Sequence, residues 1–515
     1  MWRRTLLAVP MAVFVLMALG NAFTHIPWCD EGAIAGPAFN LITHGRMAST
    51  ILEPTAHTFV RRSNNGSGAV SPARLDQHAY WMPPLDFIAQ AGWYEVFGFS
   101  VFSMRALSIA WGLVALASWV WIVEALSKDQ TLGLVTLCFL AVDGTLITTA
   151  SDGRMDMMSA ALGFAALASY LKLRERNLSA GIVASQALAV ASGLTHPLGG
   201  CLAFIALLVL TLYMDRERLR PRHIFLAMIP YVVGAVGWGL YILQDPRDFL
   251  TQFNSNAFAR FQRSYFTPWG IIWREIKVRY LSAFGLGSGS AGLARLKIFV
   301  LAAYVVGTLG AICSKDVRRQ KGLRMLLILA GIYLVGLMVV DSSKKDHYLI
   351  YGVAPLCVAW SLWIYRSWMN RSLPRPLIIL AVSGFACLQI GRTLQRIAEN
   401  QYRKTYAPAV AFLKSNVPKG SFVMGGCELG FGLGFDADLS DDPTLGYYTG
   451  KKPDFIAFRT SSSGYRCDDW DLSEEATFRG SGKDESKVYQ HVTKMLTQDY
   501  QKLYSDGFYQ VYSRR

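Results

Sequence analysis

Long apolar stretches alternate with short polar segments over most of the first 395 positions of this chain. An apolar run of about 17–25 residues is long enough to cross a bilayer as a helix. About eleven runs therefore predict membrane-spanning helices: 5–23, 101–124, 131–149, 154–173, 179–195, 198–214, 224–244, 294–313, 323–341, 347–366 and 375–391. A further run, 84–98, is shorter and carries Asp86 and Glu95, so its length alone does not decide whether it spans.

The basic residues of the short connections decide the role of 84–98. If this run does not cross, the strongly basic connections all fall on one side, as the positive-inside rule requires. If it crosses, every later basic connection moves to the outer side. We therefore expect 84–98 to be an interfacial helix on the outer face. The residues concerned are Arg3, Arg4, Lys128, Lys172, Arg174, Arg176, Arg216, Arg218, Arg220, Arg222, Lys315, Arg318, Arg319, Lys321, Arg324, Arg366, Arg371 and Arg375.

The tail of the chain has a different pattern, with turn signals between short strand-like runs such as 421–424 and 455–458. About 115 residues suffice for a small α/β domain. The predicted fold class is thus mainly α, a polytopic helical bundle with interfacial helices in the first outer loop and a small C-terminal α/β domain. The predicted domains are a membrane domain at 1–395, with outer loops at 24–100 and 245–293, and a soluble domain at 396–515. We interpret the first apolar run as an uncleaved anchor.

Composition agrees with a membrane protein. Hydrophobic residues make up 52% of the 515 residues and charged residues 17%, against about 25% charged in soluble domains. A net charge of +15 would favour nucleic acid as the partner of a soluble protein. Here the Lys and Arg residues lie in short connections, so we interpret them as orientation signals and lipid-headgroup contacts, with membrane lipids as partners and no nucleic acid.

The eight cysteines have no metal-like spacing. Five of them fall inside apolar runs, where a thiol behaves as a small hydrophobe. Cys427 and Cys467 lie in the polar tail. An oxidising compartment would allow them to pair, and the sequence leaves that pairing open.

Two acidic groups are predicted to face outward. The first, Asp30 and Glu31, follows the first span directly, where one carboxylate can act as a base and the other can hold a partner or a metal. The alternative is that Asp30 merely caps a helix that begins at residue 31. The second group surrounds Asp156, one turn into an apolar run, with Asp152 and Arg154 close by. It predicts a polar pocket, or an Asp–Arg pair that only fixes helix packing.

Several cations and one aromatic residue complete the outward set. Lys344, Lys345 and His347 lie at the outer end of a span, against the positive-inside bias, which favours a phosphate-binding role over a solvated loop. Arg105 lies inside an apolar run, where it either snorkels to the headgroups or binds a phosphate or an internal carboxylate. His196 also ends a span on the outer side, and Trp81 suits the headgroup zone.

The chain lacks the signatures of soluble enzymes, including phosphate-binding loops, dinucleotide fingerprints and nucleophile elbows. Its spans are mostly clean, and its polar groups gather at one surface, which favours chemistry at the interface. Two other functions stay open at this point. A transporter or lipid flippase would use Asp30 and Asp156 near the membrane midplane. An assembly protein would bind partners through the tail.

The order of these motifs resembles that of the protein O-mannosyltransferase and aminoarabinose (lipid A) transferase superfamily, which has the GT-C fold. The resemblance covers roughly residues 1–395 and depends on order and common sidedness. The motifs are Asp30-Glu31, Met82-Pro83-Pro84-Leu85, Phe102-Ser103-Met104-Arg105, Arg154-Met155-Asp156, Gly193-Leu194-Thr195-His196-Pro197 and Tyr348 to Pro355.

The resemblance implies inverting transfer of a sugar from a polyprenyl-phosphate donor to a protein, lipid or glycan acceptor on the periplasmic or lumenal side. Asp30 would be the general base, with Glu31 beside it, and Asp156 would belong to the catalytic set. The residues implied in substrate binding are Asp152, Arg154, Arg105, His196, Lys344, Lys345, His347 and Trp81. No cofactor is required, and a divalent metal stays open. We expect a bacterial inner membrane, with the active site and the tail domain periplasmic.

The sequence departs from this superfamily at two positions. Many bacterial relatives have Lys where this chain has Met82, and Lys where it has His196. Both differences remove a cation expected near the donor phosphate. An aminoarabinose-type specificity is therefore not expected, and the identity of the sugar stays open.

Overall fold

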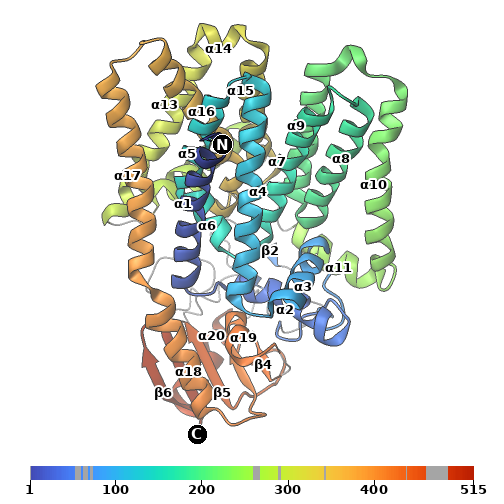
Figure 1. Cartoon of the computed structure of the whole chain (residues 1–515). Helices are drawn as coiled ribbons and strands as arrows, with labels where there is room; N and C mark the ends of the chain where they lie inside the picture. The colour runs from blue at the N-terminus through green and yellow to red at the C-terminus, as the bar shows by residue number, and fades with distance from the viewer. Residues whose placement is uncertain are drawn as a thin grey trace. The chain divides into compact units, whose positions relative to one another are not determined.

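The computed structural model describes residues 2–52, 60–61, 68–69, 74–258, 267–287, 292–341, 344–435, 438–459 and 485–515. Its internal contacts divide the chain into two compact units (Figure 1). Unit 1 comprises Met1–Ala22, Arg105–Gly239 and Ser264–Ala398, and unit 2 comprises Phe23–Met104, Leu240–Arg263 and Glu399–Arg515.

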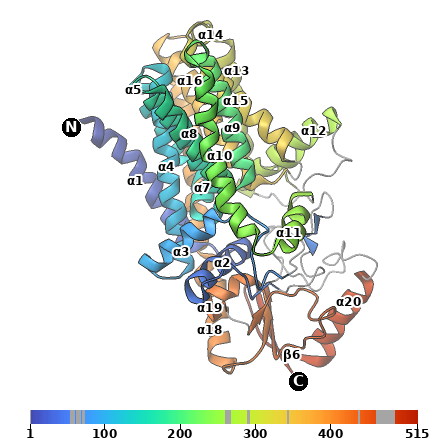
Figure 2. The ribbon, with the colours of Figure 1, turned by 90° about the vertical axis from the view of Figure 1, so that its right-hand side faces the viewer.

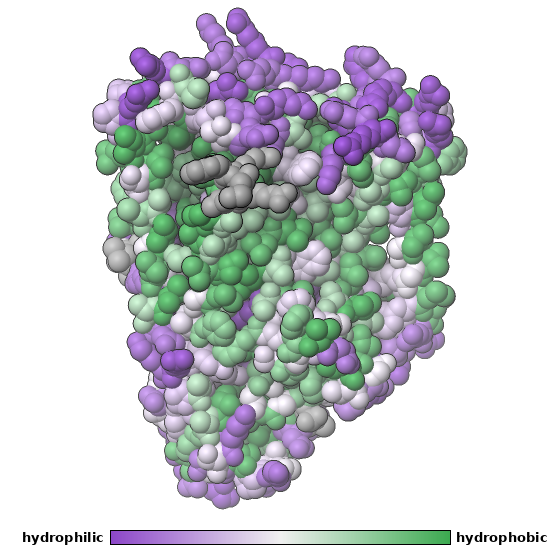
Figure 3. Space-filling view, viewed as in Figure 1, coloured by the Kyte–Doolittle hydropathy of each residue, from purple (hydrophilic) through white to green (hydrophobic). Residues whose placement is uncertain are grey.

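Unit 1 is a helical bundle. Its helices, some of which extend into the other unit, are α1 (Trp2–Thr24), α4 (Val101–Ser127), α5 (Gln130–Val142), α6 (Gly144–Ser151), α7 (Met155–Leu173), α8 (Leu178–Thr195), α9 (Pro197–Asp215), η1 (Arg216–Arg218), α10 (Pro221–Ile242), α12 (Pro268–Arg274), η3 (Glu275–Leu286), η4 (Gly292–Leu296), α13 (Lys297–Cys313), α14 (Lys315–Arg319), α15 (Lys321–Val340), η5 (Asp346–Leu349), α16 (Ile350–Met369) and α17 (Arg375–Glu399). Figure 3 shows hydrophobic residues over the sides of these helices and hydrophilic ones gathered at the end that carries α14.

Nine helices among the described residues are long and apolar enough to cross a membrane, or ten if the bent pair α5 and α6 forms one span. This set differs from the predicted one at two places. The run 131–149 is not one straight helix, because α5 and α6 meet at an angle of 60°. The run 154–173 forms α7, a 19-residue helix that is almost wholly buried and is not among the nine. The run 84–98 forms only the 13-residue helix α3 (Leu85–Phe97), which is also not among them.

A buried carboxylate explains the break between α5 and α6. Asp143 Oδ1 accepts the backbone N–H groups of Thr145 and Leu146, each at 2.9 Å, and so caps the start of α6. Its Oδ2 accepts the Tyr304 hydroxyl at 2.5 Å and the Gln389 amide at 2.6 Å. A buried carboxylate needs such partners, so the kink is tied to α13 and α17 by hydrogen bonds.

The basic connections of unit 1 lie at one end of the bundle. The connection after α4 contacts the one after α7, with Lys128 Nζ 3.7 Å from Glu175. Arg174 pairs with Asp215 at the end of α9, and Arg218 Nη1 lies 2.9 Å from the same carboxylate. These are the connections that the positive-inside argument grouped together.

Unit 2 contains the first polar loop, α11 and the C-terminal residues. Its helices are α2 (Cys29–His44), α3, α11 (Pro246–Phe258), η6 (Tyr402–Tyr406), α18 (Ala407–Asn416), η7 (Cys427–Leu429), α19 (Gly430–Leu433), α20 (Glu485–Lys494) and η9 (Met495–Asp499). Its strands are β1 (Val60–Arg61), β2 (Gly68–Ala69), β3 (Val423–Gly425), β4 (Leu439–Ser440), β5 (Phe455–Arg459), β6 (Tyr500–Asp506) and β7 (Tyr509–Arg514).

Five of these strands form a mixed sheet in the order β4-β3-β5-β7-β6. β3 is parallel to β4 and β5, whereas β7 is antiparallel to β5 and β6. Successive side chains of a strand point to opposite faces. Tyr512 packs in one core with Val488 and Val492 of α20, while the ring of Tyr509 lies 6.1 Å from that of Tyr406 in η6. Helices therefore cover both faces of the sheet, as Figure 2 shows for α18 and α20.

The start of α2 packs closely on the turn η7. A Cβ atom on Gly32 would lie 2.4 Å from the Cys427 carbonyl oxygen and 2.8 Å from the Glu428 nitrogen. The Cys427 thiol also donates a hydrogen bond to the Cys29 carbonyl at 2.8 Å. Only glycine fits at position 32, so the first polar loop and the C-terminal residues form a single packed body.

We expect Gly32→Ala to destabilise unit 2 by about 1–3 kcal/mol, since the added methyl group overlaps backbone atoms that cannot rotate away. The midpoint of thermal unfolding of the full-length protein in detergent would measure this loss. Gly92→Ala in α3 is the matched control, because a Cβ there meets nothing within 4 Å. Equal midpoints for the two variants would contradict the close contact at Gly32.

Candidate active site

The acidic pair lies in the first turn of α2. Trp28 is the N-cap, and its backbone N–H donates to Glu31 Oε2 at 2.8 Å. The alternative interpretation, in which Asp30 merely caps this helix, is therefore wrong. Both carboxylates are buried, with Asp30 6% and Glu31 0% exposed. The helix N-terminus stabilises negative charge here. Glu31 is buried because it accepts the hydrogen bond of the capping turn. Asp30 has no part in that turn, so helix capping does not account for its burial.

A polar ladder on α3 adds further negative charge to this part of unit 2. The Gln90 amide donates to Asp86 Oδ2 at 2.7 Å, and the Tyr94 hydroxyl donates to Gln90 Oε1 at 3.0 Å. Burial raises the pKa of Tyr94 well above its usual value, and the charges of Asp86 and Glu31 raise it further. The sequence argument used Asp86 only as a reason against a span. Asp86, Gln90 and Tyr94 are spaced four residues apart, and this spacing in the sequence places polar side chains on one face of a helix.

The C-terminal residues contribute two more carboxylates, the buried Glu428 and the half-buried Asp441. The Cys427 backbone N–H donates to Asp441 Oδ2 at 2.9 Å, and the Tyr509 hydroxyl donates to Glu428 Oε1 at 3.1 Å. Burial raises the pKa of Asp441 to about 7, and the neighbouring Glu428 charge adds to this effect. Sequence reasoning did not find Glu428 and Asp441, because no local pattern in the chain shows that their segment packs against the start of α2.

We expect the free energy of unfolding to fall with rising pH because of the raised pKa of Asp441. Its folded-state pKa of about 7 lies above the ordinary value of 3.8, so its contribution is fully present below pH 4 and is lost as the pH rises to 7. Three pH units at about 1.4 kcal/mol each give a loss of order 4 kcal/mol. We expect Asp441→Asn, which keeps an acceptor for Cys427, to unfold at a higher temperature than wild type at pH 8. The exposed substitution Asp506→Asn is the control, and the same pH profile for all three proteins would exclude this effect.

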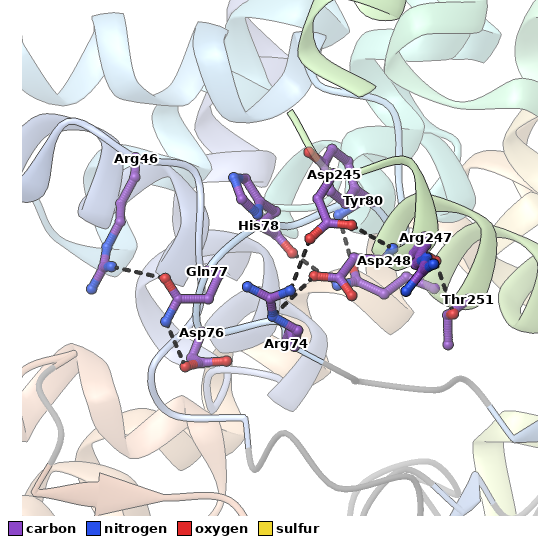
Figure 4. A network of polar contacts seen from close by, with 11 residues as sticks. Arg46, Arg74, Asp76, Gln77, His78, Tyr80, Asp245, Arg247, Asp248 and Thr251 are labelled. Atoms are coloured by element: carbon purple, nitrogen blue, oxygen red, sulfur yellow. Dashed lines mark hydrogen bonds and ion pairs between the residues drawn. The ribbon is translucent and has the colours of Figure 1, made fainter. Parts of the chain in front are cut away.

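A hydrogen-bonded network in unit 2 joins α11 to the segment before α3, and Figure 4 shows the part of it around Arg74 and Asp245. Arg74 Nη1 lies 2.9 Å from Asp245 Oδ2, and the Gln252 side chain bonds the backbone of both Tyr80 and His78 at 2.8 and 2.9 Å. The Asn256 amide donates to the Trp81 carbonyl at 2.6 Å. These bonds hold helix α11 against the segment that leads into α3. Trp81 lies in this segment and is half-buried. Its indole N–H has no hydrogen-bond partner among the described residues.

In unit 1, the second acidic group forms a buried ion pair. Arg154 Nε lies 2.8 Å from Asp156 Oδ2, and their side chains are 7% and 0% exposed. Arg154 is the N-cap of α7, so Asp156 lies in the first turn of that helix. Its other oxygen, Oδ1, is buried and accepts no hydrogen bond from the described residues. The Asp–Arg pair that the sequence allowed is present, and it leaves one carboxylate oxygen available to a further donor.

His196 lies at the junction of α8 and α9. Its Nδ1 accepts the Leu198 backbone N–H at 3.2 Å and caps α9, and its Nε2 lies 3.5 Å from the Tyr348 hydroxyl. With Nδ1 acting as an acceptor, the ring is neutral and carries its proton on Nε2. The side chain is 2% exposed. Its geometry is thus that of a helix cap and a hydrogen-bond donor, and a lysine at this position would not make the cap.

Lys344 belongs to a buried network that the sequence did not reveal. Arg279 Nε lies 2.9 Å from Glu275 Oε1, and Arg279 Nη2 lies 2.7 Å from Asp341 Oδ2. Lys344 Nζ lies 2.9 Å from Glu275 Oε2. Burial lowers the pKa of Lys344, and Glu275 opposes that change. Two cations and two carboxylates, one of each from η3 and one of each from the connection between α15 and α16, therefore balance each other.

The remaining candidates lie around the same bundle. Lys345 follows the network, and its carbonyl accepts Arg279 Nη1 at 3.3 Å. The ring of His347 packs edge-on against Tyr348, with 4.3 Å between centroids. Arg105 is fully buried in α4, and its Nη1 donates to the Ala22 carbonyl at 2.6 Å, so it neither snorkels nor is solvated. Asp152 is half-buried at the end of α6.

The structure therefore sorts the expected residues into two sets. Unit 2 holds Asp30, Glu31 and Trp81. Unit 1 holds the others: Arg105, Asp152, Arg154, Asp156, His196, Lys344, Lys345 and His347. No group of three or more His, Cys, Asp or Glu residues suited to a metal ion occurs among the described ranges. The pairing of Cys427 with Cys467 lies outside those ranges, because residue 467 is not described.

Comparison with known proteins gives likenesses in structure. No protein-family model matches the chain, and a search of curated protein sequences also finds no match. The chain is similar to ArnT from Cupriavidus metallidurans bound to undecaprenyl phosphate, with a TM-score of 0.63 and 15% identity over 99% of this chain and 98% of that one. It is also similar to the oligosaccharyltransferase of Archaeoglobus fulgidus, with a TM-score of 0.55 and 12% identity over 98% of this chain and 74% of that one.

The chain has the GT-C fold. The likeness to ArnT extends over nearly the full length of both proteins, so it includes the C-terminal residues as well as the bundle. The fold implied by the motif order, a polytopic GT-C bundle with a small C-terminal α/β part, is thereby confirmed.

Proposed function

We propose that this protein is a membrane glycosyltransferase that moves a sugar from a polyprenyl-phosphate donor to an acceptor on the non-cytoplasmic face. The observation that carries this proposal is the GT-C fold along the whole chain, shared with an enzyme bound to undecaprenyl phosphate. A second likeness, at a TM-score of 0.51, is to the archaeal oligosaccharyltransferase AglB in complex with an inhibitory peptide and a dolichol-phosphate. Both neighbours thus hold a lipid phosphate.

In the proposed reaction, Asp30 removes the proton of an acceptor hydroxyl or amine. The acceptor atom attacks the anomeric carbon, the bond from that carbon to the phosphate oxygen breaks, and the lipid phosphate leaves with both bonding electrons. The configuration of the sugar inverts. Asp30 lies at a helix N-terminus, where the helix dipole favours a negative charge, and a general base requires the charged form.

The other expected residues have supporting roles in this proposal. Asp156, held by Arg154, would contribute to the catalytic set through its second oxygen, while Asp152 and Trp81 would line the substrate. Arg105, Lys344, Lys345 and His347 would balance the charge of the leaving phosphate. His196 would donate a hydrogen bond rather than a charge. No step requires a metal, and a divalent ion stays an open part of the proposal.

The orientation in the membrane rests on charge. The basic connections share one end of unit 1, and the positive-inside rule assigns that end to the cytoplasm. The acidic pairs would then face the periplasm of a bacterial inner membrane. A transporter remains the competing function, because its Asp residues would carry a coupling ion and would need no acceptor.

Membrane vesicles supplied with labelled polyprenyl-phosphate sugars test the proposal. We expect label to appear on an endogenous acceptor in vesicles that contain the protein and not in vesicles without it. Movement of lipid or solute across the vesicle with no transfer from any donor would overturn the enzyme in favour of the transporter. A panel of donors with different sugars and chain lengths would identify the sugar, which neither the fold nor the residues determine.

A further inference from the structure

Two cysteines of unit 2 meet where the start of α2 packs on η7. Cys29 is the first residue of α2 and is half-buried, whereas Cys427 is the first residue of η7 and is 2% exposed. The Cys427 thiol donates to the Cys29 carbonyl at 2.8 Å, although 398 positions separate the two residues in the chain. Both are thiols in this structure. The proposed transfer of a sugar uses neither of them.

Close backbone packing brings the two cysteines together. Cys29 and Gly32 are three residues apart in α2, so they lie on the same face of the helix. A Cβ atom at position 32 would lie 2.4 Å from the Cys427 carbonyl oxygen and 2.5 Å from its carbonyl carbon. A disulfide needs an approach of this kind, with the two Cα atoms about 4.4–6.8 Å apart. The lack of a side chain at Gly32 therefore brings Cys29 within side-chain reach of Cys427.

The other cysteines in the described ranges have a different setting. Each lies in a different helix of the apolar bundle of unit 1, where a thiol behaves as a small hydrophobe: Cys138 in α5, Cys201 in α9, Cys313 in α13, Cys357 in α16 and Cys387 in α17. Cys29 and Cys427 instead lie beside carboxylates. The Cys29 thiol is 4.0 Å from Asp30 Oδ1, and the Cys427 backbone N–H donates to Asp441 Oδ2 at 2.9 Å. Hydrophobic packing in a membrane bundle therefore does not account for this pair.

We propose that Cys29 and Cys427 form a disulfide bond that joins the first turn of α2 to η7. This inference rests on the orientation given in the proposed function, which places Asp30 and the residues around it in the periplasm, an oxidising compartment where disulfides form and persist. A disulfide between residues so far apart in the chain restricts the unfolded state strongly. The bond holds the turn that carries Asp30 and Glu31 against the C-terminal residues, and so it fixes the acidic pair of the proposed site.

The bond forms by thiol–disulfide exchange with an oxidant that is itself a protein or small-molecule disulfide. Cys29 is the more exposed cysteine and meets the oxidant first. Its thiolate attacks one oxidant sulfur, and the other oxidant sulfur leaves and takes up a proton.

Cys427 completes the reaction from within the protein. Burial raises the pKa of its thiol to about 12, so it reacts second, when contact with Cys29 holds the two sulfurs together. Its proton passes to the adjacent Asp441 carboxylate, its sulfur attacks the Cys29 sulfur, and the remaining oxidant sulfur leaves. The two cysteines lose two electrons and two protons, and the oxidant disulfide becomes two thiols.

Differential thiol labelling of the full-length protein tests the bond. Membranes are dissolved in denaturant with N-ethylmaleimide, the protein is then reduced, and the thiols released by reduction take up iodoacetamide. We expect iodoacetamide on Cys29 and Cys427 and N-ethylmaleimide on Cys387. Mass spectrometry before reduction should show the peptide of Cys29 linked to that of Cys427. N-ethylmaleimide on both of these cysteines in wild type, or a bond from Cys427 to Cys467 instead, would overturn the proposal.

Thermal unfolding in detergent measures what the bond does. Reduction should lower the midpoint of wild type by about 5 °C or more and should leave that of Cys29→Ser unchanged. Cys387→Ser removes an exposed thiol of α17 and is the control, which should respond to reduction as wild type does. Equal midpoints for oxidised and reduced wild type would contradict a bond that fixes α2.

Sugar transfer is measured in the same samples, so that the two proposals can fail separately. A mapped bond without transfer from any donor would remove the proposed function and keep the bond. Transfer by a protein in which both cysteines carry N-ethylmaleimide would remove the bond and keep the function.

Discussion

Asp30→Asn is expected to lower the rate of sugar transfer by about 10²–10⁴-fold, the usual contribution of a positioned general base. Asparagine keeps the shape of the side chain but cannot accept a proton from the acceptor. Trp28 and Glu31 form the capping turn without Asp30, so the start of α2 should keep its structure. The initial rate of transfer in membrane vesicles at matched expression is the measurement, with thermal unfolding as the check on folding.

The matched variants separate chemistry from structure. Asp506→Asn in β6 removes an exposed carboxylate and should leave the rate unchanged. Glu31→Gln weakens the acceptor of the capping turn and should lower stability as well as the rate, because Glu31 is fully buried. A full rate in Asp30→Asn would remove this residue from the base role and direct attention to Glu31 or Asp156. Loss of transfer together with loss of the folded protein would mean that Asp30 has a structural role.

Arg279→Met is expected to cause the largest loss of stability in unit 1, of about 3–5 kcal/mol. The guanidinium is fully buried and pairs with Glu275 at 2.9 Å and Asp341 at 2.7 Å. Its removal takes away the cation that bridges two buried carboxylates, and buried charges that lose a partner are costly. Arg279→Lys should also destabilise, since an ammonium cannot bridge two carboxylates as the planar fork does.

The midpoint of thermal unfolding in detergent measures this effect, with the exposed Arg319→Met as the control. Combining Arg279→Met with Glu275→Gln and Asp341→Asn should recover part of the loss, because the carboxylates then no longer need a cation. An unfolding midpoint for Arg279→Met equal to that of the control would show that water or ions enter this network freely. A triple variant as unstable as Arg279→Met would show that packing, rather than charge, is what the substitution disturbs.

Much of the architecture followed from local pattern. Length and hydropathy located the spans, and the charge of the short connections distinguished the 13-residue α3 from a membrane helix. The kink at Asp143 was missed, because an apolar run of sufficient length reads as one straight helix. The carboxylate interrupts it only because Tyr304 and Gln389, more than 150 residues away, supply its partners.

The candidate site shows the same division. Asp30, Asp156 and Arg154 were found from sequence because charged residues at the ends of apolar runs are rare and costly. Glu275 and Arg279 were missed because they lie in a polar loop where charges are ordinary, and only their burial beside Asp341 and Lys344 makes them unusual.

The sequence by itself determined that the chain enters the membrane, which connections are basic, and where carboxylates interrupt apolar runs. These properties depend on neighbours in the chain and on transfer from water to lipid. Only the tertiary structure decided which distant residues meet, as with Gly32 against Cys427 and Arg279 between Glu275 and Asp341. Burial and pairing depend on contacts between distant segments, and those contacts leave no periodic signal along the chain.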